Sequence, residues 1–314
     1  MDLIIETDIG HDPDDVFAIC YLHSVGVNIR AIVVAAGKKV QDKDEAPYMV
    51  ALVKFLCKEL GLDIPVGHFP NEAKLPIVEA NRQHYGAFHI DLLEQYGHPL
   101  KAESDGTGQE VLTQAFKDYP NAELFICGPM LNTGRFLMQD EVTEITRATV
   151  QGGFLPYSVY SPSVRLKKFE GKNSFRTWNL DGSVQDAQTV IHAPNIKQRR
   201  FVSKNVCHTI IYDKEIHELV KDAPANNRAD EIFRDGMELY LQKKSSKAFH
   251  DPAAAVCHLH PEIATWVKGD LLYDISEGKW TTRANEAGDD IIGDVDRDTL
   301  WQHLIFKEKY EESA

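Results

Sequence analysis

The chain has few cysteines, and their pattern excludes two kinds of site. They number five in 314 residues, and each lies in an apolar segment far from the others. Such a pattern builds neither a disulfide framework nor a thiolate metal centre, so we expect buried, reduced thiols and a cytoplasmic protein. The five are Cys20, Cys57, Cys127, Cys207 and Cys257.

Long hydrophobic runs and positive charge are also scarce. No stretch approaches the ~20 apolar residues that cross a bilayer, and no signal-peptide-like region precedes Asp2, so we expect a soluble protein with no membrane partner. The formal net charge is -14, which disfavours nucleic acid as a partner. The one basic stretch, residues 197–204, is expected to flank a strand at the surface.

What is present is the composition of a globular protein, with 43% hydrophobic and 26% charged residues. Strand-like and helix-like segments alternate along the first half, which predicts parallel βαβ units. We expect a single α/β domain over residues 1–314, built on a doubly wound, mostly parallel sheet with helices on both faces. Strands are expected at Asp2–Thr7, Ile29–Ala36, Glu123–Cys127 and Arg147–Val150, and helices at Asp14–Gly26, Tyr48–Leu60 and Val111–Phe116.

The second half is less regular. Residues 155–179 are rich in Pro, Ser, Lys, Tyr and Gly without a sustained period, which is typical of a binding loop. Beyond this loop, helices are expected at Ser183–His192, Ala229–Lys244 and Arg297–Lys307, a strand within Phe201–Tyr212 and a hairpin within Trp266–Thr282.

The most informative stretch is the turn after the first expected strand, which carries Asp8, Asp12, Asp14 and Asp15. Carboxylates this close repel one another unless they are protonated or share a cation, and oxygen ligands suit Ca²⁺ or Mg²⁺. Ligands of α/β proteins bind beyond the carboxyl ends of parallel strands, where this turn is expected to lie. Helix capping is the alternative for one or two of the aspartates, but it does not explain Asp8.

Two neighbouring residues late in the chain could complete this cluster. Asp251 follows His250 and precedes Pro252 at the expected start of a helix, so it is either a further carboxylate of the site or a plain helix cap. A histidine with an ordinary pKa near neutrality suits general acid catalysis, which makes His250 a candidate. A surface histidine is the alternative in a chain with 13 of them.

Two further segments offer neutral ligands. Cys127 ends an expected strand before Gly128-Pro129, so its carbonyl could face the crevice as a metal ligand, unless this is only a turn. Asn179 can donate and accept hydrogen bonds with sugar hydroxyls, and Trp178 offers either a stacking face or core packing.

In this order and spacing, the segments resemble the nucleoside hydrolase family, the inosine-uridine-preferring N-ribohydrolases, over nearly the full length. Residues 7–15 are similar to the family's Asp-x-Asp-x-Gly-x-Asp-Asp signature with two extra residues. Residues 127–132 are similar to its Gly-Pro-Leu-Thr-Asn turn, and residues 151–153 stand where the family has Met-Gly-Gly. His250-Asp251-Pro252 matches its late His-Asp-Pro element.

The resemblance implies Ca²⁺-dependent hydrolysis of the N-glycosidic bond of a ribonucleoside, by a homo-oligomer that is a dimer or tetramer. Asp8 would act as general base toward a metal-bound water, and His250 would assist departure of the base. Asp14, Asn179 and Asp251 would contact ribose hydroxyls. The implied metal ligands are Asp8, Asp15, the Cys127 carbonyl and Asp251.

Two positions depart from the family pattern. Lys38 follows Gly37 where the family has Gly-Asn, and Thr177 stands where it has the Glu of Glu-x-Asn. Together with Arg176, both changes raise the positive potential near the sugar and favour a 5′-phosphate or another anionic group. The alternative is drift of contacts within a loop. We place Lys38 and Trp178 among the expected substrate-binding residues, while base preference stays open.

Two other interpretations of the aspartate turn stay open. A related enzyme could cleave another ribosyl or glycosyl bond, and a sugar-binding protein could keep the metal without turnover. The combination of Asp8, Asp15 and Asp251 with His250 argues against the binding protein, because a bare metal site needs no histidine beside it.

Overall fold

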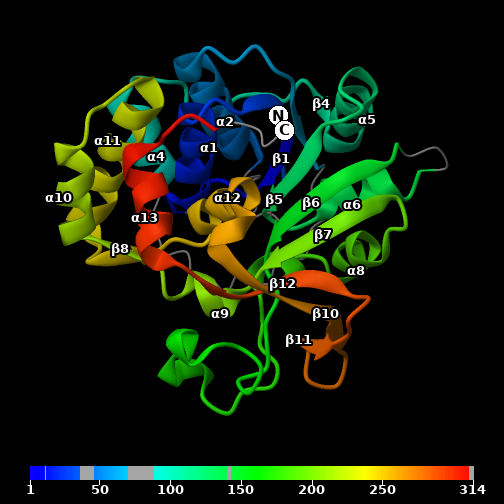
Figure 1. Ribbon diagram of the computed structural model, residues 1–314. Helices are drawn as coiled ribbons and strands as arrows, with labels where there is room; N and C mark the ends of the chain where they lie inside the picture. Colours follow the sequence, from blue (N-terminus) through cyan, green and yellow to red (C-terminus); the bar gives the residue numbers. More distant parts are fainter. Residues whose placement is uncertain (11, 36–45, 70–87, 140–142, 311–314) are drawn as a thin grey trace.

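The computed structural model describes residues 1–10, 12–35, 46–69, 88–139 and 143–310 (Figure 1), so Lys38 lies outside the described residues. One ten-stranded sheet runs through them, in the order β11-β10-β12-β7-β6-β5-β1-β2-β3-β4. Its strands are β1 (Asp2–Thr7), β2 (Asn28–Val34), β3 (Val66–His68), β4 (Gly106–Thr107), β5 (Glu123–Cys127), β6 (Ile145–Gln151), β7 (Ile196–Val202), β10 (Ala264–Asp274), β11 (Lys279–Ala284) and β12 (Asp289–Val295). Every pairing from β12 to β4 is parallel, so the predicted sheet is confirmed.

Helices cover both faces of this sheet (Figure 1). On one face α12 packs on β5, β6 and β7, and α1 packs on α12 and α11; on the other, α5 packs on β2 and β3, and α6 packs on α5 and α8. Strands covered on both sides need apolar side chains throughout, and β1 supplies them with Leu3, Ile4 and Ile5, all fully buried. The helices are α1 (Asp14–Ser24), α2 (Ala46–Leu60), α4 (Phe88–Gln95), α5 (Gly108–Asp118), α6 (Leu131–Leu137), α7 (Trp178–Asp181), α8 (Val184–His192), α9 (Lys204–Cys207), α10 (Lys214–Asp222), α11 (Arg228–Lys243), α12 (Asp251–Leu259) and α13 (Arg297–Phe306).

The strand register brings the carboxyl ends of β1 and β5 together. Thr7 pairs with Cys127 on β5 and with Val34 on β2, so the turns that follow these strands share one edge. A Cβ atom on Gly128 would lie 2.5 Å from the Asp8 nitrogen, so only glycine allows this approach. The aspartate turn and the end of β5 are therefore neighbours, as the sequence predicts.

In the second half the three expected helices are confirmed as α8, α11 and α13, and two other expectations are corrected. β10 and β11 form the predicted antiparallel hairpin. The basic stretch of residues 197–204 does not flank a surface strand, because most of it is β7, which lies inside the sheet between β6 and β12. Its Arg199 Nε contacts Asp289 Oδ1 at 2.9 Å, an acid supplied by the neighbouring strand. The strand expected within Phe201–Tyr212 is also misplaced, since β7 ends at Val202 and β8 (Ile211–Asp213) pairs with β9 (Ser246–Ala248) in a separate sheet.

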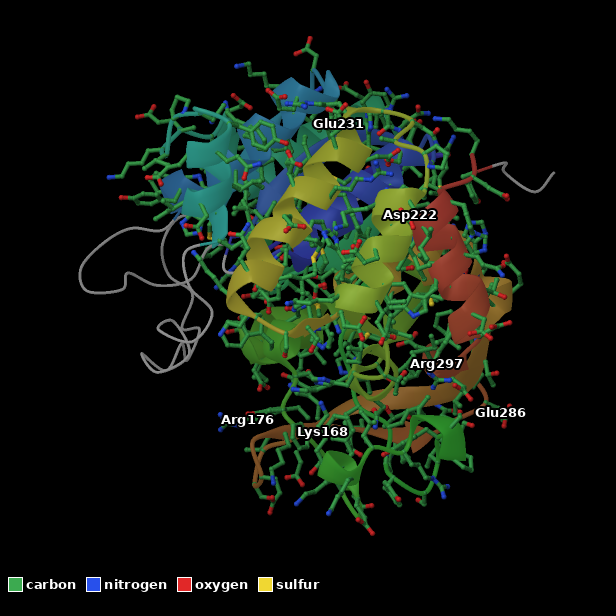
Figure 2. All side chains as sticks on the ribbon, turned by 90° about the vertical axis from the view of Figure 1, so that its left-hand side faces the viewer. Lys168, Arg176, Asp222, Glu231, Glu286 and Arg297 are labelled. Carbon is green, nitrogen blue, oxygen red and sulfur yellow. The ribbon has the colours of Figure 1, made fainter. Side chains whose placement is uncertain are left out.

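The irregular segment before Asn179 is confirmed, with two short 3-10 turns at Pro162–Val164 and Lys167–Phe169. Its end is attached to the hairpin, because Phe175 and Trp280 exchange two backbone hydrogen bonds of 2.9 Å. The Trp280 indole also donates to Asp181 Oδ1 in α7, at 2.9 Å. Figure 2 shows Lys168 and Arg176 of this segment together at one end of the molecule, far from Glu231.

The five cysteines are free and buried, as expected. No helix in the described ranges is long and apolar enough to cross a membrane.

Candidate active site

The aspartate turn is organised by Thr7. Its hydroxyl accepts a hydrogen bond from the Ile9 nitrogen, at 3.1 Å, and donates to Asp15 Oδ1 at 2.5 Å. Asp12 Oδ1 accepts from the Asp14 nitrogen, at 3.1 Å, so one aspartate does serve the start of α1. The side chains of Asp14 and Asp15 are buried in the first turn of α1.

A buried cluster of Asp15, Cys127 and Asp251 lies at this edge of the sheet. One ligand atom from each residue, with sulfur counted for Cys127, lies within 4.8 Å of the other two. Burial, followed by the negative charges of neighbouring aspartates, raises the pKa of both Asp15 and Asp251 well above the usual range. Carboxylates that repel one another in this way are stabilised by a cation, so the donor set fits a bound metal ion.

The sulfur of Cys127 is a poor ligand in this setting. It donates to the Glu6 carbonyl at 3.5 Å, and burial together with the charges of Asp15 and Asp251 raises the pKa of the thiol well above its usual value. Metal binding by cysteine requires the thiolate, which this environment disfavours. Cys127 is the last residue of β5, opposite Thr7.

Lys247 and the His250 main chain hold one oxygen of Asp14, and the other oxygen has no partner among the described residues. Asp14 Oδ2 lies 3.2 Å from Lys247 Nζ and accepts from the His250 main-chain nitrogen, at 3.1 Å. Lys247 Nζ also lies 3.1 Å from Asp12 Oδ2. Among the described residues, no group donates to the buried Asp14 Oδ1, which leaves it open to a ligand donor.

His250 is the N-cap residue of α12, next to Asp251. Its Nδ1 lies 3.3 Å from Asp14 Oδ2, and its ring packs edge-on to His208 with centroids 4.7 Å apart. Burial and the charge of Lys247 lower the pKa of His250 well below its usual value, so the expectation of a pKa near neutrality is not met. The imidazole is neutral, and its Nε2 is buried without a hydrogen-bond partner in the described part of the chain.

Trp178 and Asn179 of α7 reach the same edge from the irregular segment. The Trp178 indole nitrogen donates to Asp8 Oδ2 at 2.7 Å, and the side chain is 39% exposed. Asn179 is buried, and its Nδ2 donates to the carbonyl and to the Oε1 of Gln151, at 3.0 and 2.9 Å. The structure therefore brings Asp8, Asp14, Trp178 and Asn179 to one edge, while Asp8 lies outside the three-residue cluster.

Three residues of this edge escaped the sequence analysis: Lys247, Gln151 and Glu6. Glu6 is fully buried and accepts from the main-chain nitrogens of Asn132 and Thr133, at 2.7 and 3.1 Å. It thereby joins the end of β1 to the start of α6. An acidic residue inside an otherwise apolar strand was the signal for Glu6, since a buried carboxyl needs hydrogen-bond partners.

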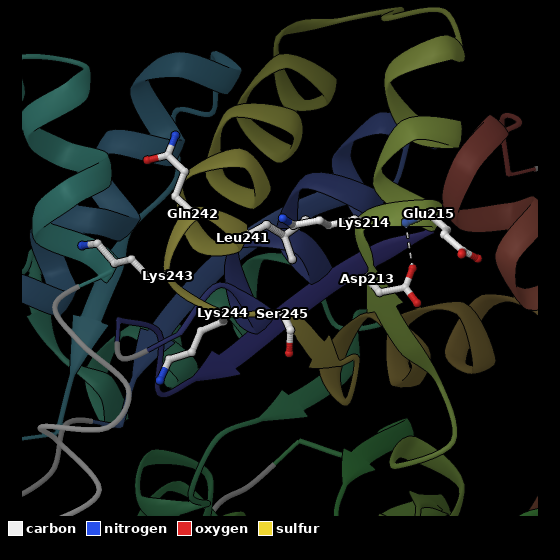
Figure 3. Close-up of a pocket in the computed structure, with 8 residues that line it drawn as sticks. All are labelled: Asp213, Lys214, Glu215, Leu241, Gln242, Lys243, Lys244 and Ser245. Atoms are coloured by element: carbon white, nitrogen blue, oxygen red, sulfur yellow. Dashed lines mark hydrogen bonds between the residues drawn. The ribbon is translucent and has the colours of Figure 1, made fainter.

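A surface pocket lies elsewhere, between the start of α10 and the end of α11 (Figure 3). None of the predicted site residues lines it. Its lining consists of Asp213, Lys214, Glu215, Leu241, Gln242, Lys243, Lys244 and Ser245. This pocket is therefore separate from the predicted site at the carboxyl edge of the sheet.

A buried acidic cluster at the carboxyl edge of a doubly wound sheet, beside an open carboxylate oxygen, defines an α/β protein with a candidate ligand site at that edge. The sequence matches the model of the inosine-uridine preferring nucleoside hydrolase family over residues 3–302. The chain belongs to this family, and its reaction class is hydrolysis of N-glycosyl bonds.

Solved structures of nucleoside hydrolases share the fold. A plant nucleoside hydrolase superimposes with a TM-score of 0.72 at 16% identity, covering 98% of each chain. A purine-preferring ribonucleoside hydrolase from Gardnerella vaginalis gives 0.68 at 15% identity, again over 98% of each chain. An inosine-uridine preferring nucleoside hydrolase from Bacillus anthracis gives 0.70 at 16% identity, over 96% of this chain and 97% of that one. No curated protein sequence matches the chain.

Proposed function

We propose that the protein hydrolyses the N-glycosidic bond of a ribonucleoside in a Ca²⁺-dependent reaction, releasing the base and ribose. The observation that carries this proposal is the buried Asp15–Cys127–Asp251 cluster beside the unpartnered Asp14 Oδ1. The cluster supplies anionic ligands for a cation, and Asp14 supplies an acceptor for a sugar hydroxyl.

Asp8, Asp15, Asp251 and the main-chain carbonyl of Cys127 would hold the ion. Carboxylate and carbonyl oxygens are the ligands that Ca²⁺ prefers, and the high pKa of the Cys127 thiol leaves its carbonyl as the better donor. When bound, the metal supplies a coordinated water of lowered pKa and neutralises the clustered carboxylates.

Asp8 is the proposed general base. It follows β1 directly and is only partly buried, so it can take a proton from the attacking water. Its negative charge acts on both Asp15 and Asp251, which places it beside the cluster. The Trp178 indole holds the Asp8 carboxylate through Oδ2, which orients it beside the cluster.

Asp14 and Asn179 are the proposed ribose ligands, with Asp251 beside them. Asp14 offers Oδ1, to which no described residue donates. Asn179 donates through its Nδ2 to Gln151 and offers its amide oxygen to the sugar. Hydrogen bonds of this kind hold the sugar as positive charge develops at the anomeric carbon. Trp178, which is partly exposed next to Asn179, offers a stacking face.

His250 would hold the departing base. Its Nδ1 lies 3.3 Å from the Asp14 Oδ2 acceptor, which favours the ring proton on Nδ1, and its Nε2 is buried where no described residue binds it. In this tautomer the neutral imidazole accepts a hydrogen bond at Nε2 from an N–H group of the base. The base is then stabilised as the bond to ribose breaks.

We also propose a cytoplasmic location, supported by five reduced cysteines. The single domain and the dimeric or tetrameric state remain predictions.

The test is hydrolysis of inosine and uridine by the Ca²⁺-loaded full chain in phosphate-free H₂¹⁸O. The products are reduced at once with borohydride, which stops oxygen exchange at the free sugar, and their masses are measured by mass spectrometry. We expect one ¹⁸O on the sugar and none on the base, because water attacks the anomeric carbon. Absence of base release from any ribonucleoside, or a requirement for added phosphate, would overturn the proposal.

A further inference from the structure

The irregular segment beside the proposed site is strongly basic although the chain as a whole has a net charge of -14. Between residues 165 and 176 one acid, Glu170, stands among five cations: Arg165, Lys167, Lys168, Lys172 and Arg176. Lys204 of α9 joins this segment, because its Nζ donates to the Arg176 carbonyl at 3.0 Å. We call these five cations together with Lys204 the basic wall. Such a group of positive charges raises the local concentration of anions, even in an acidic protein.

Two chains of contacts lead from the proposed ribose ligands to these cations. Along the backbone, Asn179 is three residues from Arg176, whose carbonyl binds Lys204. Through the rings, His250 contacts Asp14 and packs on His208; His208 packs on Phe169 at 5.6 Å, and Lys168 Nζ lies 5.1 Å from the Phe169 ring centre. Both chains therefore end at the same group of cations.

Asp181 is near enough for its charge to act on Arg176 and Lys204, but it forms no ion pair with them. No described carboxylate lies within ion-pair distance of Lys168, Lys204 or Arg176, and Lys204 Nζ lies 5.0 Å from the Phe175 ring centre. Burial and the charge of Lys168 lower the pKa of Lys204 to about 8. The Thr177 hydroxyl, next to Arg176, is buried without a hydrogen-bond partner in the described part of the chain. Lys168 and Arg176 are exposed and Lys204 is partly buried, so this group, with the Thr177 hydroxyl beside it, can make charge-assisted hydrogen bonds to an anion.

We propose that Lys168, Lys204 and Arg176 bind a phosphate carried on C5′ of the ribose, so that the preferred substrate is a ribonucleoside 5′-monophosphate. This inference rests on the proposed function, because Asp14, Asn179 and the metal occupy the 2′ and 3′ hydroxyls and leave the 5′ carbon for the basic wall. The reaction is unchanged: water forms the new C1′–O bond, the C1′–N bond breaks, the base leaves with a proton, and the phosphate stays on ribose 5-phosphate.

Paired substrates test the inference. For inosine and its 5′-monophosphate, kcat/KM of the Ca²⁺-loaded full chain is measured, and the ratio of the two values is the readout. We expect a ratio of about ten or more in favour of the monophosphate, since one charge-assisted contact is worth about a factor of ten. Lys168→Ala and Lys204→Met should each lower the ratio about tenfold, and the matched control Lys117→Ala on the exposed face of α5 should leave it unchanged.

Calorimetry distinguishes a site for a sugar phosphate from a site for free phosphate. Together with the turnover data, it also distinguishes failure of this inference from failure of the proposed function. Ribose 5-phosphate should bind about tenfold more tightly than ribose or inorganic phosphate. Equal binding of inorganic phosphate would point to a free-phosphate site and overturn the inference. Turnover of inosine with a ratio near one would overturn it while the proposed function stands. If neither substrate is cleaved, the proposed function fails, and weak binding of ribose 5-phosphate would then reject the phosphate site as well.

Discussion

The indole nitrogen of Trp178 donates a 2.7 Å hydrogen bond to Oδ2 of Asp8, which joins the irregular segment to the turn after β1. Asp8 is the proposed general base, so its orientation depends on a side chain that lies 170 positions later in the sequence. The same segment carries Asn179 and most of the basic wall. The segment that we propose to contact substrate therefore also positions the proposed general base.

Trp178→Phe should lower kcat/KM for a ribonucleoside about tenfold, because it removes one hydrogen bond to a carboxylate and keeps the ring. Assays at saturating Ca²⁺ separate this effect from any change in metal affinity, because Asp8 is also a proposed metal ligand. Trp266→Phe is the matched control, since its indole donates to the Pro261 carbonyl away from the cluster. Steady-state assays with all three proteins decide the matter, and equal activity of Trp178→Phe and wild type would refute this role.

Asp15→Asn should stabilise the metal-free protein and abolish its response to Ca²⁺. Neighbouring aspartates and burial raise the pKa of Asp15, so removing its charge relieves repulsion. Saturating Ca²⁺, at about 100 times its Kd, should raise the unfolding free energy of wild type by about 2.7 kcal/mol and leave the variant unchanged. Thermal unfolding measures both effects. Asp63→Asn, in an exposed turn, is the control and should behave as wild type.

Lys247 and Asp12 should be energetically coupled. Lys247→Met leaves Asp12 and Asp14 without their cation and should cost about 3–5 kcal/mol of unfolding free energy, as for a broken buried ion pair. Without Lys247, the negative charges of Asp12 and Asp14 repel each other, and Asp12→Asn removes one of them. The double variant should therefore lose less unfolding free energy than the sum of the two single losses. Denaturant unfolding of the four proteins gives the coupling, and strict additivity would be the contrary result.

Binding of ribose 5-phosphate should weaken as the pH rises through about 8, where Lys204 loses its proton. Burial and Lys168 lower that pKa, while Asp181 and Cys207 raise it. Phosphate is a dianion above its second pKa of about 6, so affinity should be greatest near pH 7. The Lys204→Arg variant keeps its positive charge above pH 8, so its affinity for ribose 5-phosphate should be the same there as at pH 7. Calorimetry across this range is the measurement, and a flat profile for wild type would contradict the role of Lys204.

The sequence predicted what is encoded locally. Four aspartates in one turn, next to a buried strand, indicate a charged site at the carboxyl edge of the sheet, and the structure places Asp15 and Asp251 there. The apolar runs of β1 and β5 also predicted the parallel core, because strands buried on both faces have few polar positions.

Long-range partners could not be predicted in the same way. The counter-ion of Asp12 and Asp14 is Lys247 in β9, and no local pattern connects these residues. Burial by elements that are distant in the sequence lowers the pKa of His250 well below its usual value. Arg199 and Arg200 were expected at the surface because charged runs are usually solvated, yet β12 supplies Asp289 and Asp290 beside them.

The central claim is that the carboxylate cluster holds the ion on which cleavage of the ribosyl bond depends. Its most direct test is a Ca²⁺ titration of the chelated full chain in which bound metal and base release are followed in the same samples. We expect one Ca²⁺ ion per chain, with the rate of base release rising in proportion to the fraction of chains that hold the ion. Full activity after chelation, or Ca²⁺ binding without release of base from either inosine or its 5′-monophosphate, would contradict it.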